Sequence, residues 1–478
     1  MTTNRKNILI ISVDDMCAFW RYRDVFGVKL HTPNLDRIIA KSTHFTSAYC
    51  QAPVCGPSRA SAMSGLSPMQ TGIFDNYINL FDVIRPEQLW QHKIKQAGYY
   101  CSTAGKVHHG FKPLRTDLHN ALYSHPPVHV HFGPRRDVAQ KQYGGKTGGS
   151  TTDPKDDRDY YDHRSARHAA NFLLKYNGPA PFYREVGFHH PHIPLRTPDR
   201  FKAMYDHRAF TKPADWANGF TLSPYVDRYL GGDPKYQDTE YWQKTVRNYF
   251  SAITHVDEHI GRVWDVLQAS RHAKNTVVVI FSDHGYHLGD KDRFRKLTLY
   301  EEVTRIPLII HDPDSPPTQV DDPVGLIDLG PTLLDYTGCE PLQNSPGTSL
   351  RNQVQGARKP DRTVPSFWYG NLSARSGPYR MSLYQDGSVE FYNVTQDLWF
   401  TQDLGTDHPD FAPTLAQVLQ AAAQHGAGLN DHPGHYGIDR HGTQGGLSSD
   451  PIPSTDVTPG YRRQYLAPTT QRCETHIP

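Results

Sequence analysis

Five short runs of apolar and β-branched residues are spaced along the first two thirds of the chain. They are NILIISV at 7–13, YYCSTA at 99–104, FYREVGF at 182–188, TVVVIFS at 276–282 and IPLIIH at 306–311. Runs of this length and composition are typical of buried strands. Because helical patterns separate them, we expect an α/β fold with a largely parallel sheet covered by helices on both faces.

The stretches between these runs carry the helical patterns. Helices are predicted at 33–41, 58–64, 160–175, 245–269 and 328–336. Thr32 stands at the cap position of the first helix, and Pro33 suits its first turn. Residues 112–158 instead mix Gly, Pro, His and charged residues, and we interpret them as a long loop insertion beside a cleft.

The pattern changes after about residue 340. PYRMSLYQDGSVEFYNV alternates apolar and polar residues around Asp386-Gly387, which predicts a tight hairpin and an antiparallel sheet over 365–400. A helix is expected from Pro413 to Gln424, and the Gly-, Pro-, Ser- and Thr-rich end indicates an arm that lies on its own body or on a second subunit of a homo-oligomer. The expected divisions are a large α/β domain at 1–345, a smaller antiparallel subdomain at 346–433 and the arm at 434–478.

Composition narrows the class of protein. The 478 residues include 51 Lys and Arg against 49 Asp and Glu, so a net charge of +2 gives no reason to expect nucleic acid as a partner. The chain has no apolar run long enough to predict a membrane span, and its first apolar run ends in Asp14-Asp15, unlike a signal peptide. The cysteines have neither disulfide-framework nor zinc spacing, so we expect reduced thiols in a cytoplasmic protein. The alternative is a periplasmic or secreted protein whose signal peptide was trimmed. They are Cys17, Cys50, Cys55, Cys101, Cys339 and Cys473.

Acidic residues follow two of the predicted strands. Asp14 and Asp15 end the first run, and Asp283 and His284 follow the run at 276–282. The carboxyl ends of parallel strands meet at one sheet edge, where clustered carboxylates favour a divalent metal between them. Oxygen ligands favour calcium or magnesium, while the histidine leaves manganese and zinc open. The alternative is that each pair caps a helix or lies in a solvated turn.

The segment PVCGPSRAS places a cysteine before a predicted helix. Cys55 would lie at the positive end of that helix beside Arg59, where a thiol becomes reactive and an anion binds. The alternative, taken from the residue type alone, is a small buried hydrophobic side chain.

The local sequence bears on that choice. Cys55-Gly56-Pro57-Ser58-Arg59, with Ser64-Gly65 after it, resembles the signature of formylglycine-dependent sulfatases in the alkaline phosphatase superfamily. Asp14-Asp15, Gly105-Lys106-Val107-His108-His109 and Ser282-Asp283-His284-Gly285 match further family segments in the expected order. GKVHHG, VGFHHPHIPLRTPDRF and FSDHGYHLGD are similar to the iduronate sulfatase branch. The resemblance implies a large mixed, mostly parallel sheet between helices and a smaller C-terminal α+β subdomain on an antiparallel sheet.

The resemblance also implies a reaction. A formylglycine-generating enzyme would convert Cys55 to formylglycine, whose hydrate has two hydroxyls. One attacks sulfur and expels the alcohol, and the other collapses to the aldehyde and releases sulfate. By residue matching, the metal, with calcium first, is held by Asp14, Asp15, the modified Cys55, Asp283 and His284. Arg59 steadies the hydrated aldehyde, and Lys106 and Lys296 bind sulfate oxygens.

The candidate histidines have different expected roles. His189 matches the histidine that protonates the leaving oxygen, a task suited to imidazole near neutral pH. His109 matches the nucleophile-orienting histidine of the iduronate branch, whereas many other sulfatases match at His108. His108, His190 and His192 are interpreted as polar cleft lining. Two basic side chains complete the set. Lys291 is expected to be exposed to solvent. Arg196 is a candidate to bind a carboxylate on the substrate.

The predicted function is hydrolysis of a sulfate monoester, on a sugar or related polyol. A phosphonate monoester or phosphodiester hydrolase is the alternative enzyme, since that group resembles this fold and can share the cysteine signature; Asp14-Asp15 favours the sulfatase. An inactive sulfatase-like binding protein would be expected to have a broken signature, and this one is intact. An unmodified Cys55 thiol acting as nucleophile is a further possibility.

Overall fold

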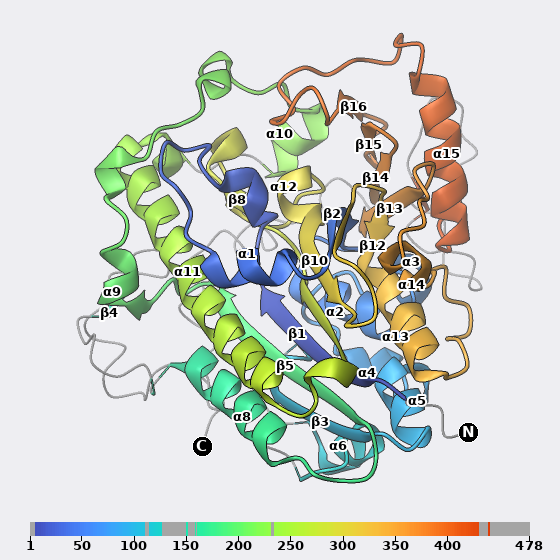
Figure 1. Cartoon of the computed structure of the whole chain (residues 1–478). Coiled ribbons are helices and arrows are strands. Elements are labelled where there is room, and N and C mark those ends of the chain that lie inside the picture. Colours follow the sequence, from blue (N-terminus) through green and yellow to red (C-terminus); the bar gives the residue numbers. More distant parts are fainter. Residues whose placement is uncertain are drawn as a thin grey trace.

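A mixed β-sheet forms the centre of the molecule (Figure 1). The computed structural model describes residues 5–109, 114–126, 150–151, 158, 160–230, 234–429 and 438–439. Within these residues eight strands form the sheet: β1 (Asn7–Asp14), β2 (Thr43–Tyr49), β3 (Tyr100–Gly105), β5 (Phe182–Pro191), β7 (Thr276–Ser282), β10 (Arg305–His311), β11 (Thr318–Val320) and β12 (Val324–Gly325). Their order is β11-β2-β10-β7-β1-β5-β3, with β12 paired to β2.

The sheet is mostly parallel, as predicted. Strands β3, β5, β1 and β7 run in one direction, and β10 is antiparallel to both β7 and β2. All five predicted strands are confirmed. Strand β2 was not predicted, because THFTSAY is too polar to be recognised as a buried run, yet every one of its residues is buried.

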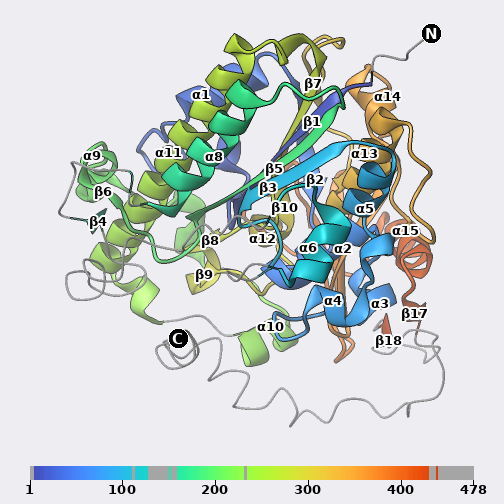
Figure 2. The ribbon, with the colours of Figure 1, turned by 90° about the horizontal axis from the view of Figure 1, so that it is seen from below.

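Helices cover both faces of the sheet (Figure 2). One face carries α1 (Pro33–Ile39), α8 (Tyr161–Lys175) and α11 (Thr239–Ala269), and the other carries α2 (Cys55–Ser64), α5 (Trp90–Gln96) and α13 (Leu329–Thr337). The alternation along β1 divides its side chains accordingly: Leu9 and Ile11 enter the core under α11, and Ile8 and Ile10 enter the core under α5 and α13. Two hydrophobic cores, one on each face, therefore hold the central sheet in place.

A second sheet follows the first along the chain. Strands β13 (Thr363–Trp368), β14 (Asn371–Ser376), β15 (Tyr379–Leu383) and β16 (Val389–Asn393) are antiparallel in that order, and α15 (Phe411–Gln424) packs on them. The predicted hairpin turn is confirmed, with Gly387 at φ 85°. The antiparallel sheet and its helix agree with the expected architecture, while the domain boundaries at 345 and 433 stay predictions.

The remaining elements are short. The helices are α3 (Pro68–Thr71), α4 (Leu80–Val83), α6 (Thr116–Leu122), α9 (Asp199–Lys202), α10 (Pro224–Leu230), α12 (Glu301–Thr304) and α14 (Arg351–Val354). The 3-10 turns are Phe19–Tyr22, Pro86–Gln88, His207–Ala209, Ala214–Asn218, Pro234–Gln237, Ala273–Asn275, Asp290–Asp292 and Leu326–Asp328. The strands are β4 (Ser150–Thr151), β6 (Thr197–Pro198), β8 (His287–Leu288), β9 (Phe294–Arg295), β17 (Gly428–Leu429) and β18 (Ile438–Asp439).

Three expectations about local structure need correction. The segment 112–158 is not all loop, because α6 lies in it; most of its other residues are outside the described ones. Helix α11 begins at Thr239, six residues before the predicted start, because the Asp238 carboxylate accepts a hydrogen bond from the backbone N–H of Tyr241. The Thr32 side chain caps no backbone group of α1. The arm at 434–478 lies outside the described residues except for β18.

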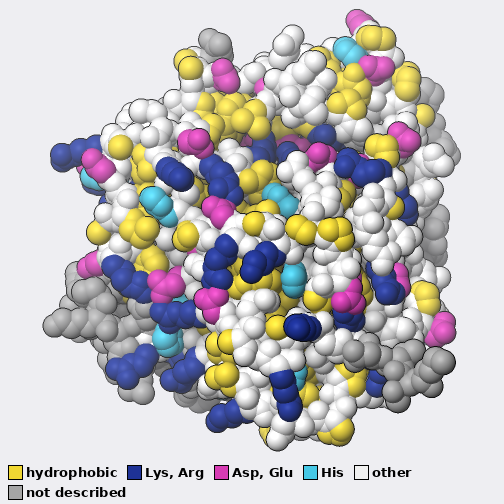
Figure 3. Space-filling model, in the orientation of Figure 1, with side chains coloured by type: hydrophobic (Ala, Val, Ile, Leu, Met, Phe, Trp, Pro, Cys, Tyr) yellow, Lys and Arg dark blue, Asp and Glu magenta, His cyan; other side chains and the backbone are white. Residues whose placement is uncertain are grey.

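The surface charges and the cysteines do not narrow the class of protein further. Basic and acidic side chains are interspersed on the face shown in Figure 3. Among the described residues, no helix has the length and apolar character needed to cross a membrane. The five cysteines in the described part of the chain form no disulfide, and Cys473 lies outside it.

Arg380 of β15 joins the two sheets. Its guanidinium is buried and donates to the backbone carbonyl of Leu299, at 2.8 Å from Nη2. Its Nη1 lies 3.3 Å from the Glu301 carboxylate, which also accepts a hydrogen bond from the hydroxyl of Tyr49 on β2 at 2.8 Å. A buried ion pair thus ties the second sheet to helix α12 and to the loop before it.

We expect Arg380→Ala to lower the free energy of unfolding by about 3–5 kcal/mol, because it leaves Glu301 buried without its principal cation. Urea unfolding of the full chain measures this. Arg351→Ala is the matched control, since its exposed pair with Asp335 at 3.0 Å is worth about 0–1 kcal/mol. Equal losses in the two variants would contradict the role given to Arg380.

Candidate active site

The predicted site residues come from the carboxyl ends of four neighbouring parallel strands. Asp14 ends β1, Asp283 follows β7, Lys106 follows β3, and His189 lies near the end of β5. All four side chains are buried. The convergence expected from the strand order is therefore observed, and neither acidic pair is a solvated turn.

Cys55 is the first residue of α2, so its side chain lies at the positive end of that helix. Its Sγ is 3.0 Å from Lys296 Nζ and 3.2 Å from His284 Nε2. Asp15 Oδ1 lies 3.7 Å from the same sulfur. The thiol is buried, but charged groups surround it, so it is not simply a hydrophobic side chain of the core.

Arg59 lies one turn further along α2 and is buried. Its Nε donates to Asp283 Oδ2 at 2.8 Å, and its Nη1 donates to the backbone carbonyls of Lys106 and Val107 at 3.0 and 2.8 Å. Its Nη2 lies 3.4 Å from Asp14 Oδ1. One guanidinium therefore links helix α2 to the ends of β1, β3 and β7.

The carboxylates and cations of the site balance one another. Lys106 Nζ contacts Asp14 Oδ2, and Lys296 Nζ donates to Asp15 Oδ1 at 2.7 Å. Burial alone would raise the pKa of Asp14 and of Asp15, but neighbouring cations, Lys106 at Asp14 and Lys296 at Asp15 among them, lower both well below the usual value. Both groups are ionised at neutral pH.

His284 responds in the opposite direction. Burial alone would lower its pKa, but the charges of Asp283 and Asp15 raise it well above the usual value. Its Nε2 lies 3.0 Å from Asp15 Oδ1, and its Nδ1 lies 2.9 Å from the backbone carbonyl of Gly285. The ring is therefore fixed in orientation, with Nε2 toward the carboxylates.

The donor set fits a divalent cation. Asp15 Oδ2 is buried, and the described part of the chain provides no hydrogen-bond partner for it. Ligand atoms of Asp14, Asp15, Cys55 and His192 lie within 4.8 Å of one another, and so do those of Cys55, Asp283 and His284. An orphaned carboxylate oxygen among further carboxylates is the environment that a hard cation such as calcium or magnesium prefers.

The histidines occupy different surroundings. His189 Nδ1 lies 3.7 Å from Asp14 Oδ2, and His192 Nε2 lies 3.9 Å from Asp15 Oδ2. His108 turns to the Tyr123 hydroxyl at 2.9 Å, away from the carboxylates. His109 has an exposed surface at the margin of the site, yet the surrounding protein atoms and the charge of Lys106 lower the pKa of its imidazole to about 3. The geometry thus favours His109 over His108 as the one available to a substrate.

Two interpretations of side chains change. His192 does more than line the cleft, because its ring faces Asp15. In the sequence, the only indication was the pattern HHPH, in which Pro191 separates His192 from His190. Lys291 is not a solvated charge, because its buried ammonium donates to the Trp399 carbonyl at 2.9 Å and lies over three aromatic rings. Those rings belong to Phe220, Tyr300 and Phe400. Arg196 is half-buried in the segment after β5.

A glycine pair lets the strands that carry Lys106 and His189 approach closely. A Cβ atom on Gly187 of β5 would lie 1.9 Å from the carbonyl oxygen of Lys106, and one on Gly105 would lie 2.0 Å from the carbonyl oxygen of Gly187. Any side chain at either position would push the Lys106 backbone away from β5.

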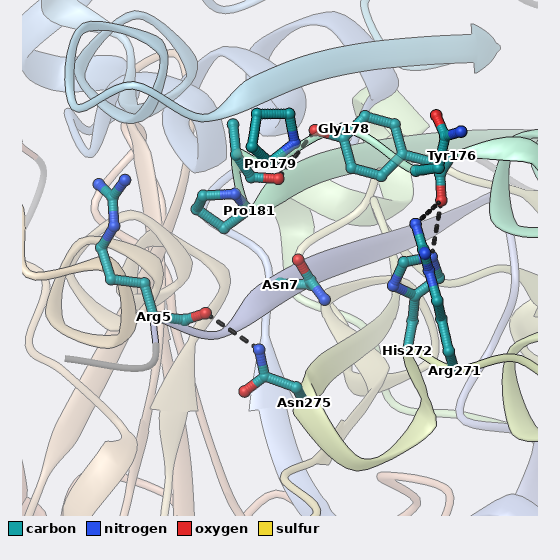
Figure 4. Close-up of a pocket in the computed structure, with 11 residues that line it drawn as sticks. Arg5, Asn7, Tyr176, Gly178, Pro179, Pro181, Arg271, His272 and Asn275 are labelled. Atoms are coloured by element: carbon teal, nitrogen blue, oxygen red, sulfur yellow. Dashed lines mark hydrogen bonds between the residues drawn. The ribbon is translucent and has the colours of Figure 1, made fainter. Parts of the chain in front are cut away.

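A separate pocket lies at the opposite edge of the sheet (Figure 4). Asn7, Pro181 and Asn275 line it at the amino ends of β1, β5 and β7, and Asn275 donates to the Arg5 carbonyl at 3.1 Å. Because the carboxylates and Cys55 are at the carboxyl ends of these strands, this pocket is not part of the same site.

Sequence comparison places these features in a family. The model of the sulfatase family matches residues 6–339. A sulfatase of Formosa agariphila is 31% identical over 430 residues, which cover 82% of each chain. A choline-sulfatase of Rhizobium meliloti is 30% identical, covering 76% of this chain and 74% of that one. The iduronate 2-sulfatase of Mus musculus is 30% identical, covering 65% and 60%. The expected relation to iduronate sulfatases is thus confirmed.

Solved structures agree on the fold. The phosphonate monoester hydrolase of Agrobacterium radiobacter superposes with a TM-score of 0.71 at 18% identity, over 89% of this chain and 98% of that one. The structure of BT4656 in complex with its substrate D-glucosamine-2-N,6-O-disulfate superposes with a TM-score of 0.67 at 20% identity, over 88% and 98%. The expected alkaline phosphatase-like architecture is confirmed, and with the sequence matches it follows that this chain belongs to the sulfatase family of enzymes.

Proposed function

We propose that the protein hydrolyses a sulfate monoester on a sugar or related polyol, with formylglycine made from Cys55 and one divalent cation, calcium by preference. The observation that carries this is the position of Cys55 Sγ, 3.0 Å from Lys296 Nζ and 3.2 Å from His284 Nε2, at the start of α2 in a sulfatase-family chain. The hydrated formylglycine supplies the nucleophilic hydroxyl, and the cation supplies positive charge for the sulfate oxygens.

Asp14, Asp15, Asp283 and His284 would hold the cation, together with the group made from Cys55. Their oxygens and one imidazole lie close together, and the unpartnered Asp15 Oδ2 supports this assignment. Three carboxylates and a single nitrogen favour calcium over zinc. Maturation would require a formylglycine-generating enzyme as a partner.

Lys106 and Lys296 are assigned to the sulfate oxygens. Each ammonium already contacts a carboxylate at the sheet edge, and Lys296 also reaches the sulfur of Cys55. Fixed cations of this kind stabilise charge on the transferred group because they need no reorganisation during the reaction. Arg59 is assigned to steady the hydrated aldehyde made from Cys55. Its donors to Asp283, Asp14 and two backbone carbonyls support this assignment, because they hold helix α2 against the strand ends.

His189 is assigned as the proton donor to the leaving oxygen. Burial lowers the pKa of His189 well below the usual value. The negative charge of a sulfate ester would favour the protonated imidazole, so binding of the substrate itself prepares His189 for that task. His109, exposed at the margin beside Lys106, is assigned to orient the nucleophile.

A phosphonate monoester or phosphodiester hydrolase is the second candidate. The observation in its favour is the similarity of fold to the phosphonate monoester hydrolase of Agrobacterium radiobacter. A tetrahedral anion with phosphorus at its centre would meet the same cations. The consecutive pair Asp14-Asp15 and the sulfatase relatives favour the sulfur ester.

The sugar assignment rests on the relatives. Mouse iduronate 2-sulfatase and the glucosamine disulfate complex of BT4656 point to sulfated sugars, whereas the choline-sulfatase of Rhizobium meliloti points to a small cationic alcohol. Arg196 and the His-rich insertion remain the candidates to bind a carboxylate on the sugar.

The first prediction concerns the bond that is cleaved. Metal-loaded enzyme should turn over an aryl sulfate and a sulfated monosaccharide faster than a matched aryl phosphodiester and phosphonate. Choline sulfate completes the panel. Cys55→Ala from the same host should lower kcat/KM about 1000-fold or more, because the nucleophile is gone. The mass of the Cys55 peptide should show the aldehyde. Preference for phosphorus esters would support the second candidate, and an unmodified cysteine in active enzyme would contradict the formylglycine assignment.

The second prediction concerns the charge around Cys55 in protein made without maturation. Burial alone would raise the pKa of this thiol, but the charge of Lys296 lowers it, to about 7. Thiolate absorbance in chelator-treated protein, taken as the difference from Cys55→Ser, should titrate near that value. Lys296→Met should move the midpoint upward, while the exposed-lysine control Lys244→Met should not. A midpoint near the ordinary 9.0 in the parent chain would disprove the arrangement.

The third prediction concerns the cation. Chelation should abolish turnover, and calcium should restore it and raise the free energy of unfolding by about 2.7 kcal/mol at a concentration 100 times Kd. Asp283→Asn should show neither response. Asp322→Asn is the control, because it changes a buried carboxylate that pairs with Arg358 outside the site. This variant should keep both the calcium-dependent turnover and the calcium stabilisation. Equal calcium stabilisation of all three proteins would refute the assigned ligands.

A further inference from the structure

A second cluster of metal-binding side chains lies behind His189. It consists of Asp162 on α8, His190 on β5, and His255 and His259 on α11. All four side chains are buried, with at most 6% of any residue exposed. None of them has a role in the proposed sulfatase chemistry.

The four side chains form a chain of close contacts. Asp162 Oδ2 lies 3.2 Å from His190 Nδ1, which lies 2.8 Å from His255 Nδ1. On the other side of its ring, His255 Nε2 lies 3.0 Å from His259 Nε2. The ligand atoms of Asp162, His190 and His255 all lie within 4.8 Å of one another.

The contacts between imidazole rings limit where the protons can be. Each nitrogen-to-nitrogen contact needs one N–H and one bare nitrogen, and His255 makes such a contact at both ring nitrogens. Burial lowers the pKa of His255 well below the usual value, so its ring is neutral and donates at one nitrogen only. A single proton is then shared between the Nδ1 atoms of His190 and His255. In that state His259 Nδ1 is a buried polar atom with no hydrogen-bond partner among the described residues. The chain of imidazoles is thus incomplete as a purely hydrogen-bonded network.

We propose that Asp162, His190 and His255 bind a transition-metal ion of the zinc class, at a second site distinct from the catalytic cation. The ion would take the place of the shared proton. Ligand atoms of a tetrahedral zinc site are about 3.3 Å apart, given bonds of about 2.0–2.1 Å. The contacts of 2.8 and 3.2 Å therefore need to open by only a few tenths of an ångström.

The donor chemistry separates this site from the catalytic one. Two imidazoles and one carboxylate suit zinc or cobalt, whereas the catalytic cluster offers mainly carboxylates and suits calcium. Aromatic rings of Tyr160 and Phe201 pack on His255, at 5.3 and 5.0 Å between centroids. Arg200 and Arg262 both pair with Glu258, whose single carboxylate balances one of their two positive charges. Within the cluster, the Asp162 carboxylate supplies the negative charge that favours a cation.

The surrounding groups orient the ligands as metal sites require. His255 Nε2–H can donate to His259, which fixes the tautomer with a bare Nδ1. The Asp162 carboxylate accepts hydrogen bonds from the backbone N–H groups of His189 and His190, at 2.6 and 3.0 Å. A metal here would fasten α8 and α11 to the end of β5 and so fix the backbone that carries His189.

Cobalt(II) in the presence of excess calcium tests the proposal. Calcium occupies the oxygen-rich site, and the visible absorption of cobalt reports nitrogen and oxygen ligands. The full-length chain should bind one cobalt ion, displaced by zinc. His255→Gln should abolish this signal, His259→Gln should weaken cobalt binding about 10–100-fold, and Asp283→Asn should retain it. His44→Gln, which replaces another buried histidine, is the control that also retains it.

Two results would overturn the proposal. One is the absence of cobalt uptake by the parent chain in excess calcium. The other is a signal lost in Asp283→Asn but kept in His255→Gln, which would place the ion in the catalytic cluster. Circular dichroism checks that each variant folds, and His190→Gln removes a ligand from a different element if His255→Gln does not fold. Neither result bears on sulfate ester hydrolysis, because the ligand sets share no residue.

Discussion

The arrangement of this molecule depends on the charge balance at the carboxyl edge of its central sheet. Asp14, Asp15 and Asp283 are buried side by side, which is strongly unfavourable unless positive charge lies between them. Arg59 and Lys106 supply part of that charge from α2 and from the end of β3. The position of α2, and with it Cys55, is therefore set by the same ion pairs that make the buried carboxylates tolerable.

This constraint links the fold to the chemistry. The ammonium groups that balance the carboxylates are also the ones we assign to the sulfate oxygens, and Lys296 contacts both Asp15 and Cys55. The segment that carries Lys296 has a positive φ on either side of it, at Arg295 and Leu297. Such backbone conformations persist only where contacts on both sides hold them. Here the Thr298 hydroxyl is 2.6 Å from His287 Nε2, and the Leu297 N–H donates to the Pro53 carbonyl.

Histidines serve two different environments on either side of β5. His189 and His192 face the carboxylates of the catalytic edge, while His190 turns to the opposite side, toward Asp162 and His255. The Asp162 carboxylate accepts hydrogen bonds from the backbone N–H groups of His189 and His190, so one helix side chain holds the backbone from which these two rings point in different directions. The proposed hard-cation site and the proposed nitrogen-rich site can thus lie close together without sharing ligands.

The sequence by itself determined the family and five strands of the central sheet, and it supplied the candidate site residues. Apolar runs predict buried strands from neighbours along the chain alone, and carboxyl ends of parallel strands share an edge, so Asp14 and Asp283 could be placed together. The polar strand β2 could not be found this way, nor could the burial of Lys291, because a charged local sequence says nothing of the aromatic rings that cover it. Only the tertiary structure decided that His192 faces Asp15 and that Asp162, His190 and His255 meet, since these contacts join distant segments. The periodicity that predicts a strand or helix depends on residues adjacent in the chain. The free energy of burying a charged group depends instead on the partners that the fold brings next to it.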